Sequence, residues 1–343
     1  VLADRSPGPD GTVDGNLYLV GGGDPLLFTE GFRVTLKDSR QTQTDFAAVA
    51  DQLAALGLSR ISGDVVGDES RYDTERGIPT WSPAYQAEGA AGSLSALMVN
   101  RGQTGLAEDP DTPTRVRKLG EPAELAAQTL TSLLARRDVT VGGTWRAGSA
   151  PADAVELLRV PSPTVEELAG VVLQWSDNSA AELLTKEMGR QTSGQGTTVA
   201  GLSAITGVAS DLGLAGEELV VVDGSGLDRG NRMSCDVVAD LLDRVGPASP
   251  LGRGLAVAGE SGTLRQRLAG SRLAGRLHGK TGTLAEVNAL AGFVETDGGA
   301  TPTFVINMNG EAPDDYKLTD ELALLLLDYP DAPAPDQLGP QGP

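Results

Sequence analysis

Hydrophobic positions along the chain follow two different periods, and these periods predict the secondary structure. Apolar residues that recur every three or four positions predict a helix, and apolar residues that alternate with polar ones predict a strand. The helices predicted in this way are 44–57, 121–137, 164–175, 179–189, 197–212, 234–245 and 318–328. The predicted strands are 15–20, 61–66, 139–141, 154–160, 277–283, 289–295 and 303–309, with a loop over 68–92. The pattern therefore predicts a mixed α/β (α+β) protein.

Proline-rich stretches divide this pattern. Pro161-Ser162-Pro163 interrupts both helix and strand just before Thr164, which we expect to cap the next helix. After this point four predicted helices cluster together, and three predicted strands follow them. A domain boundary is therefore predicted near residue 161. The segment 331–343 is rich in proline and glycine and is predicted to be a loose tail.

Composition narrows the class of protein. A chain of 343 residues exceeds the usual size of a single core, and its 40% hydrophobic residues are enough to fill more than one. A formal charge of −20 opposes binding to nucleic acid and to anionic membrane surfaces. No run of eighteen apolar residues is present, so no membrane span is predicted.

Cysteine and histidine are too scarce for several kinds of site. The single cysteine, Cys235, excludes an internal disulfide, and we expect it to be buried and inert just after a helix start. With the single histidine, His278, it cannot supply the ligands of a zinc site, so no metal and no cofactor is predicted. A Ser-His-Asp triad would depend wholly on His278, which is more simply a strand side chain.

Ser176, Asp177 and Asn178 form the first polar string of chemical interest. The string lies between two predicted helices, where a loop can direct a hydroxyl and an amide into a cleft. Taken alone, the string is more simply a helix N-cap, because serine, aspartate and asparagine are preferred at the starts of helices.

A second string, Lys280-Thr281-Gly282-Thr283, falls on a predicted strand. The lysine offers a fixed positive charge, and the two threonines alternate toward one face, which suits them to binding a carboxylate. Gly282 would let another backbone or a ligand approach closely. The alternative is a strand edge with a solvated lysine.

The two strings are two of the three motifs of penicillin-recognising serine enzymes. With their context, the chain resembles the low-molecular-mass class C penicillin-binding proteins, the D-alanyl-D-alanine carboxypeptidase/endopeptidase family of the DacB type (peptidase family S13). The resemblance also rests on Trp81 and on four segments, which are 17–25 (LYLVGGGDP), 95–100 (SALMVN), 223–229 (DGSGLDR) and 262–265 (GTLR). It implies a penicillin-binding-protein/serine β-lactamase-like transpeptidase domain with inserted smaller domains.

The third motif of the family, Ser-x-x-Lys, occurs nowhere in the chain. The residues three positions before its five lysines are Val34, Arg115, Leu183, Leu277 and Asp314. In the family this motif lies upstream of the Leu-Tyr-Leu segment, so we expect an N-terminal truncation rather than a decayed relative. A start at Val1, with neither an initiator methionine nor a signal pattern, agrees with processing or truncation.

The resemblance also implies a division into domains. Residues 1–30 would belong to the penicillin-binding domain and lead into an insertion, and 31–161 would be the inserted accessory domains. Residues 162–330 would be the main part of the DD-peptidase domain, and 331–343 the flexible tail.

The resemblance implies a role for each site residue. An upstream serine would attack the D-Ala-D-Ala carbonyl, and Ser176 would relay a proton to the leaving amine. Asn178 would hold the substrate backbone, and Lys280 would add positive field to the relay. Thr281 and Thr283 would bind the terminal carboxylate across Gly282, and the Thr283 N–H would help to form an oxyanion hole.

Two further residues have assignments that stay open. Arg229 matches a position that binds a side-chain carboxylate of the stem peptide in some relatives, and it could equally form a structural ion pair. Residues 90–93 contain only small side chains where certain relatives place an aromatic. Asp223 is expected to be a turn or capping residue.

The predicted activity is therefore a β-lactam-sensitive, serine-type D-Ala-D-Ala carboxypeptidase/endopeptidase that acts on peptidoglycan stem peptides outside the cytoplasm. The 343 residues themselves would be inactive without the missing nucleophile. Two alternatives stay open, a class A-like β-lactamase and a catalytically inactive wall-binding scaffold.

Overall fold

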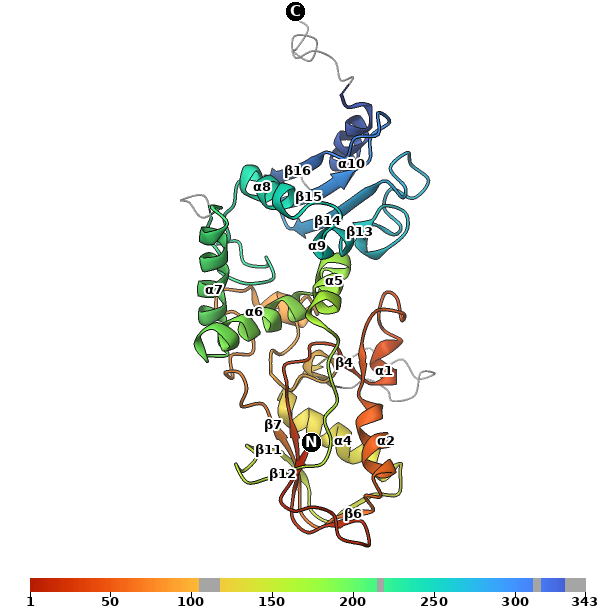
Figure 1. The fold of residues 1–343 in the computed structure, drawn as a ribbon, viewed down its shortest axis with the longest axis vertical. Helices are drawn as coiled ribbons and strands as arrows, with labels where there is room; N and C mark the ends of the chain where they lie inside the picture. The colour runs from red at the N-terminus through yellow and green to blue at the C-terminus, as the bar shows by residue number, and fades with distance from the viewer. Residues whose placement is uncertain (105–117, 215–218, 311–315, 331–343) are drawn as a thin grey trace, which may run out of the picture. The chain divides into compact units, whose positions relative to one another are not determined.

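The computed structural model describes residues 1–104, 118–214, 219–310 and 316–330, and they form two compact units (Figure 1). Unit 1 contains Val1–Leu168, Asp177–Leu212 and Val221–Asn231. Unit 2 contains Ala169–Ser176, Gly213–Val220 and Arg232–Pro343. The chain therefore leaves unit 1 and returns to it twice, and the predicted inserted-domain boundaries stay a prediction. The predicted tail over 331–343 lies outside the described residues.

Unit 1 combines short strands with longer helices. Its described strands are β1 (Leu2–Ala3), β2 (Thr12–Val13), β3 (Leu17–Val20), β4 (Leu27–Phe28), β5 (Thr44–Asp45), β6 (Arg60–Ile61), β7 (Val65–Asp68), β8 (Gln103–Thr104), β9 (Lys118–Leu119), β10 (Thr140–Val141), β11 (Trp145–Ala147) and β12 (Val155–Glu156). Its described helices are α1 (Glu30–Arg33), α2 (Ala47–Ala55), α3 (Pro83–Ala87), the 3-10 turn η1 (Asn100–Gly102), α4 (Pro122–Ala135), α6 (Asn178–Ser193) and α7 (Thr198–Asp211). Helix α5 (Val165–Trp175) begins in unit 1 and continues into unit 2.

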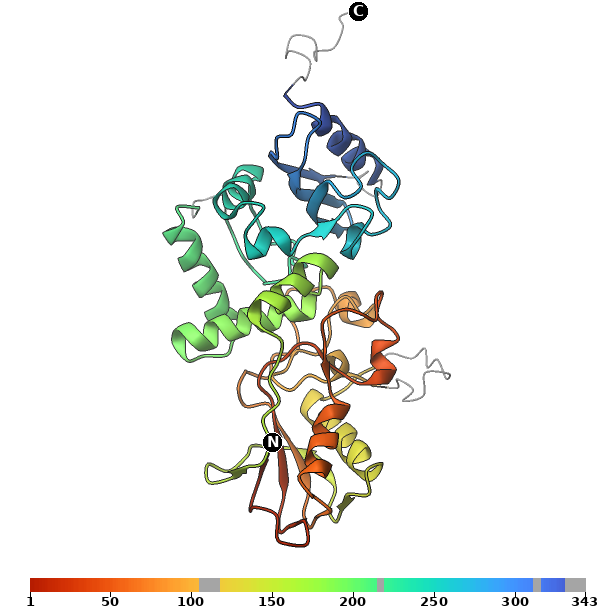
Figure 2. The same cartoon turned by 45° about the vertical axis from the view of Figure 1, so that its right-hand side comes forward.

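A five-stranded sheet with the order β11-β7-β3-β1-β12 organises the first part of unit 1. Strand β3 pairs in parallel with β7, and Leu17 and Leu19 join a core that also contains residues of α2 and α4. The ribbon shows these two helices beside the strands of the sheet (Figure 2). The N-terminal end of α4 approaches this sheet closely, because a Cβ at Gly67 would lie 2.0 Å from the Ala123 carbonyl oxygen. The sheet and its two helices thus bury one continuous apolar cluster.

The helix predicted over 44–57 begins later than its pattern indicated. Thr44 and Asp45 form strand β5, which pairs with β4, and the helix α2 starts only at Ala47. The Asp45 carboxylate accepts the Ala47 N–H at 2.9 Å, so the polar residue still marks the helix start. The predicted loop over 68–92 contains the short helix α3, and the strand β11 was not predicted.

Helices α6 and α7 pack against each other through glycines. A Cβ at Gly201 would lie 2.0 Å from the Thr185 carbonyl oxygen, and one at Gly189 would lie 2.7 Å from the Gly201 nitrogen. Only hydrogen fits at these positions, so the two backbones approach more closely than side chains would allow. The crossing orients α6, whose first turn carries Asn178.

Unit 2 is built on a four-stranded antiparallel sheet with the order β13-β14-β15-β16. Its described strands are β13 (Ala256–Val257), β14 (Leu277–Leu284), β15 (Val287–Val294) and β16 (Thr303–Asn309). Its described helices are α8 (Cys235–Val245), α9 (Pro250–Arg253), η2 (Gly262–Leu264), α10 (Tyr316–Leu325) and η3 (Leu326–Asp328). The predicted order of helices followed by strands and a last helix is confirmed here.

Both faces of this sheet are buried by different elements. Leu290 and Val294 of β15 pack in one cluster with Ala323 of α10. The alternate residue Phe293 packs in a second cluster with Leu242 of α8, against Leu173 of α5. This alternation is the period of two that a strand requires, and it fixes which side chains of β14 face α5.

Candidate active site

Ser176 directly follows the last turn of α5. Its N–H donates to the Val172 carbonyl at 3.0 Å, so it closes the helix, and its φ of 56° places it in the left-handed region. A residue with a Cβ seldom adopts this conformation, which costs of order 1 kcal/mol and persists only where the surroundings hold it. The backbone turn ends α5 and leaves the Ser176 hydroxyl to contact Lys280.

The other two residues of the tripeptide belong to unit 1. The Asp177 carboxylate accepts the Ala180 N–H at 3.0 Å and pairs with Arg101, so Asp177 is the N-cap of α6. The Asn178 side-chain amide donates to the Ala90 carbonyl at 2.8 Å. The N-cap interpretation is therefore confirmed for Asp177 only, and the three side chains have three different partners.

Lys280 is the residue that joins the two predicted motifs. Its Nζ donates to Ser176 Oγ at 2.8 Å and to the Thr281 carbonyl at 2.7 Å. Burial lowers the pKa of Lys280 from its usual value of 10.5 to about 8. The side chain is not the solvated lysine of a plain strand edge. It is a desolvated cation held against a hydroxyl, 104 residues away in sequence.

The register of the sheet explains this contact. Lys280 lies opposite Ala291, and directly opposed residues share a face of the sheet. Ala291 packs in the cluster that contains Leu173 of α5, so Lys280 emerges on the face against which α5 packs. The helix that ends at Ser176 and the strand that carries Lys280 are thus brought together by the core.

Thr281 and Thr283 lie on the other face of β14, as the strand period predicts. The hydroxyls of Thr281 and Thr263, the latter in η2, are 2.9 Å apart. Between the two threonines, a Cβ at Gly282 would meet only the Ala289 Cβ, at 3.3 Å. Strand β13 pairs with β14 only as far as Gly279. From Lys280 to Leu284 this edge of β14 therefore has no strand partner in the described part of the chain.

Asp223 is the centre of a hydrogen-bonded loop in unit 1. Its carboxylate accepts the backbone N–H groups of Gly226 and Asp228, both at 2.7 Å, and the indole N–H of Trp81 at 2.8 Å. The expected turn and capping role is confirmed. Trp81 and the 223–229 segment were both part of the family resemblance, and the structure shows that they contact each other. Arg229 lies in this loop.

Glu182 of α6 is a second buried carboxylate at the same loop, and sequence reasoning missed it because its helix pattern marks it only as polar. Its Oε1 accepts the N–H groups of Gly224 at 3.0 Å and Ser225 at 2.8 Å. Its Oε2 is buried and has no hydrogen-bond partner among the described residues. Burial, with a further contribution from the Asp223 charge, raises the pKa of Glu182 to about 7.

This carboxyl predicts a pH dependence of stability. A raised pKa in the folded state means that the folded chain binds more protons than the unfolded chain between about pH 4.5 and about pH 7. The stabilisation of the folded state by the protonated Glu182 is present below this pH window and is lost as the pH rises through it. We therefore expect Glu182→Gln to gain stability relative to the parent as the pH rises from 5 to 8, measured by urea unfolding. If the free energies of unfolding of the parent and of Glu182→Gln changed equally between pH 5 and pH 8, the prediction would be wrong.

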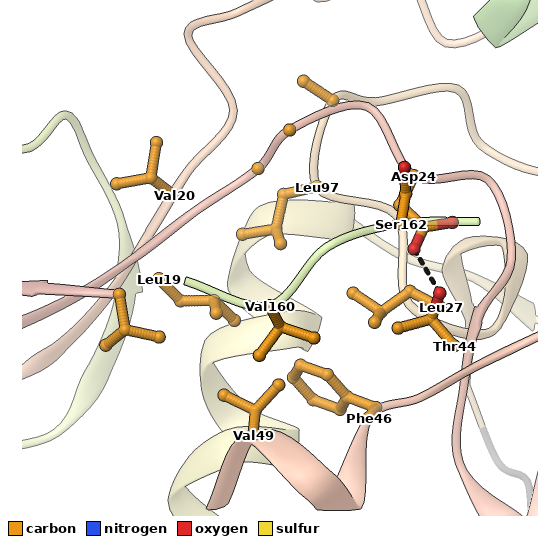
Figure 3. A pocket seen from close by; sticks show the side chains of 14 residues that line it. Leu19, Val20, Asp24, Leu27, Thr44, Phe46, Val49, Leu97, Val160 and Ser162 are labelled. Carbon is orange, nitrogen blue, oxygen red and sulfur yellow. Dashed lines mark hydrogen bonds between the residues drawn. The ribbon is translucent and has the colours of Figure 1, made fainter. Parts of the chain in front are cut away.

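A small cavity lies elsewhere in unit 1 (Figure 3). It has a volume of about 160 Å³ and is walled by apolar side chains of β3, α2 and the segment after β12, with Asp24 hydrogen-bonded to Thr44 at one end. Burial raises the pKa of Asp24. No predicted site residue lines this cavity, so it is not part of the Ser176–Lys280 arrangement.

Three further observations bear on the predictions. Cys235 is exposed at the first residue of α8, so the expectation that it is buried was wrong. The hydrophobic pattern placed Cys235 in a helix but could not tell which face of the first turn is covered.

In the described ranges, no group of three or more His, Cys, Asp or Glu side chains is arranged to hold a metal ion. No helix within those ranges is both long and apolar enough to cross a membrane.

Comparisons with known proteins agree on one family. The model of the D-Ala-D-Ala carboxypeptidase 3 (S13) family matches residues 5–115 and 103–327. A D-alanyl-D-alanine carboxypeptidase of an Actinomadura species is 31% identical over 98% of this chain and 73% of its own length. Carboxypeptidase DacB of Mycolicibacterium smegmatis is 31% identical over 91% of this chain and 67% of its own length.

A solved structure supports the fold. Penicillin binding protein 4 (dacB) from Haemophilus influenzae has a TM-score of 0.74 to this structure at 18% identity. The superposed residues cover 94% of this chain and 85% of the Haemophilus chain. A structure of the same Haemophilus protein has been solved in complex with a β-lactam. The predicted fold class, a penicillin-binding-protein-like α/β fold with extra domains, is confirmed.

Proposed function

The chain belongs to the D-Ala-D-Ala carboxypeptidase 3 (S13) family, and we propose from this membership that it is the larger part of a serine-type D-Ala-D-Ala carboxypeptidase. The substrate is a peptidoglycan stem peptide, and β-lactams act as inhibitors. The observation that carries the proposal is the hydrogen bond between Lys280 Nζ and Ser176 Oγ. It unites the two family motifs at one place, on the face of the sheet against which α5 packs.

The chemistry proceeds in two steps. A serine oxygen bonds to the penultimate D-Ala carbonyl carbon, the C–N bond to the terminal D-Ala breaks, and the serine proton passes to the leaving amine. Water then bonds to the same carbon, the ester C–O bond breaks, and a proton of the water passes to the released serine oxygen. The attacking serine belongs to a Ser-x-x-Lys motif that the 343 residues do not contain. Every experiment on activity therefore uses the full-length gene product.

Ser176 is suited to carry the proton to the leaving amine. A hydroxyl can accept one proton while it donates its own, and its contact with Lys280 fixes the oxygen in place. Lys280 adds positive charge beside this oxygen, which favours release of the Ser176 proton. The two residues act as one relay, and neither needs a metal.

The terminal carboxylate of the substrate binds at Thr281 and Thr283. Their hydroxyls share one face of β14, next to the edge that has no strand partner from Lys280 onward. A peptide added along this edge would pair with the strand backbone and reach Lys280 on one side and the threonines on the other. Gly282, with a hydrogen as its side chain, leaves room between them. The roles that the family resemblance implies for Asn178 and Arg229 stay predictions.

The proposed function places the protein outside the cytoplasm, where cross-linkable peptidoglycan is found. The test is the intact mass of the protein after incubation with benzylpenicillin. It is made on the 343-residue chain and on the full-length gene product. A covalent adduct on the full-length product alone would support the proposal. An adduct on neither would favour a wall-binding scaffold, and accumulation of free penicilloate would favour a β-lactamase.

The pH dependence of the reaction is a separate prediction. The pKa of Lys280 is about 8, so its charge is present below that pH and is lost above it. We expect kcat/KM for D-Ala release to fall on the alkaline side with an apparent pKa near 8, because kcat/KM reports ionisations of the free enzyme. In the Lys280→Arg variant the guanidinium stays charged, so this alkaline limb should disappear from its residual activity. A parent profile that stays flat to pH 10 would contradict the prediction.

A further inference from the structure

The segment 262–265 contributed to the family resemblance but has no role in the mechanism above. Residues Gly262–Leu264 form the turn η2, which follows β13 in unit 2. Leu264 is fully buried in the same cluster as Leu290 of β15, so the turn is anchored on the sheet. Gly259 N–H donates to the Leu264 carbonyl at 2.9 Å and closes the loop that contains it.

This turn packs closely against the end of α5. Gly262 has a φ of +57°, and a Cβ at this position would lie 2.3 Å from the carbonyl oxygen of Gln174. Gln174 precedes Ser176 by two residues. The backbone of the turn therefore supports the end of the helix from which Ser176 contacts Lys280, and no side chain fits between them.

The next residue of the turn contacts the strand. The Thr263 hydroxyl lies 2.9 Å from the Thr281 hydroxyl, and Thr263 is half-buried. A threonine hydroxyl has one proton to donate and two lone pairs to accept. In the structure the Thr281 hydroxyl donates to Thr263 Oγ1. Rotation of the two hydroxyls can reverse this hydrogen bond, so when Thr281 donates its proton to a substrate carboxylate, it can accept the proton of Thr263. The Thr263 hydroxyl is then the group that sets the Thr281 side-chain rotamer.

From this geometry we infer that Thr263 is a positioning residue for carboxylate recognition by Thr281. The inference rests on the proposed function, because it assigns a task to Thr263 only if Thr281 binds the terminal carboxylate. Thr263 does not touch the substrate. It orients the Thr281 hydroxyl toward the open edge of β14, and it polarises that hydroxyl through a chain of two hydrogen bonds.

The test compares variants of Thr263 in the full-length gene product by the kcat and KM of D-Ala release from an N-acyl-D-Ala-D-Ala peptide. Thr263→Val keeps the shape of the side chain and removes the hydroxyl. We expect it to raise KM about fivefold to tenfold, which is the effect of losing one hydrogen bond to a binding group. The kcat should stay within about twofold of the parent value. Thr263→Ser should restore the KM of the parent. Thr301→Val, at an exposed threonine of the same unit, should leave both constants unchanged.

A double-variant cycle separates positioning from a general structural effect. If Thr263 acts through Thr281, then Thr263→Val adds nothing to the KM of Thr281→Val. If the valine variant does not fold, the Thr263→Ser and Thr263→Ala pair takes its place, because these two variants differ only by the hydroxyl. An unchanged KM in Thr263→Val, a serine variant as impaired as valine, or equal KM values for serine and alanine would overturn the inference.

The same data distinguish this inference from the proposed function. A parent protein that releases D-Ala and forms the penicillin adduct, combined with a Thr263→Val variant of unchanged KM, overturns the role of Thr263 alone. A parent that neither releases D-Ala nor forms an adduct overturns the proposed function, and the role of Thr263 with it.

Discussion

Lys280→Ala in the full-length gene product is expected to lower the rate of D-Ala release at least a thousandfold. The substitution removes the hydrogen bond from Lys280 Nζ to the Ser176 hydroxyl, and it removes the positive charge beside the proposed proton relay. Loss of a single preorganised donor typically costs roughly a hundredfold to a thousandfold in kcat. Lys280 would supply both a donor and a charge, so the expected loss lies at or beyond the upper end of that range. The measurement is kcat/KM with an N-acyl-D-Ala-D-Ala peptide, together with the rate of acylation by benzylpenicillin.

The matched control is Lys317→Ala, at an exposed lysine of α10 in the same unit. It should retain the kcat/KM of the parent. The melting temperature of Lys280→Ala should not fall below that of the parent. Burial disfavours the charged form of Lys280, so the charged ammonium group does not stabilise the folded state. Full activity in a folded Lys280→Ala protein would show that the assignment of roles to Lys280 and Ser176 is wrong.

Gly201→Ala is expected to destabilise the folded protein strongly. The new Cβ would lie 2.0 Å from the carbonyl oxygen of Thr185, a backbone atom of α6 that cannot rotate away. Relief requires the helices α6 and α7 to move apart, and overpacking of this kind costs about 3 kcal/mol or more. The measurement is the urea midpoint of unfolding followed by far-ultraviolet circular dichroism.

The same substitution six residues later in α7 should have the opposite sign. Gly207 lies on the exposed part of the helix, and a Cβ there would meet no atom within 4 Å. Gly207→Ala is therefore expected to raise stability by about 0.5 to 1 kcal/mol, the intrinsic preference of alanine over glycine in a helix. If both variants were destabilised equally, the close crossing of α6 and α7 would not be the cause.

The long helices and strands follow from sequence because their apolar patterns are periodic over several turns or pairs. The segments predicted as 121–137, 164–175 and 234–245 are the helices α4, α5 and α8, with ends that differ by one or two residues. The three strands of unit 2 that follow η2 are likewise present as predicted. Two-residue strands such as β4 and β5 were missed, since pairing with a distant segment creates them and no local period records it.

The two motifs were visible in the sequence because their residue types are chemically distinctive. The sequence did not show which partner each side chain of the motifs contacts. Ser-Asp-Asn is compatible with both an N-cap and a site, and the structure confirms the N-cap. Asp177 caps α6 while Ser176 contacts Lys280 and Asn178 contacts the Ala90 carbonyl. The left-handed backbone of Ser176 makes this separation, and no sequence pattern predicts a positive φ at serine.

What the sequence determined by itself is local or compositional. It includes the periodic elements, the two motif strings, the lack of Ser-x-x-Lys among five lysines, and a family whose model matches 5–115 and 103–327. What only the tertiary structure decided depends on atoms that are distant in sequence. The Lys280–Ser176 contact requires the register of β14 on β15 and the packing of α5 on that face of the sheet. The lowered pKa of Lys280, the buried Glu182 and the contact of Thr263 with Thr281 likewise arise from burial and from neighbours that a linear pattern does not contain.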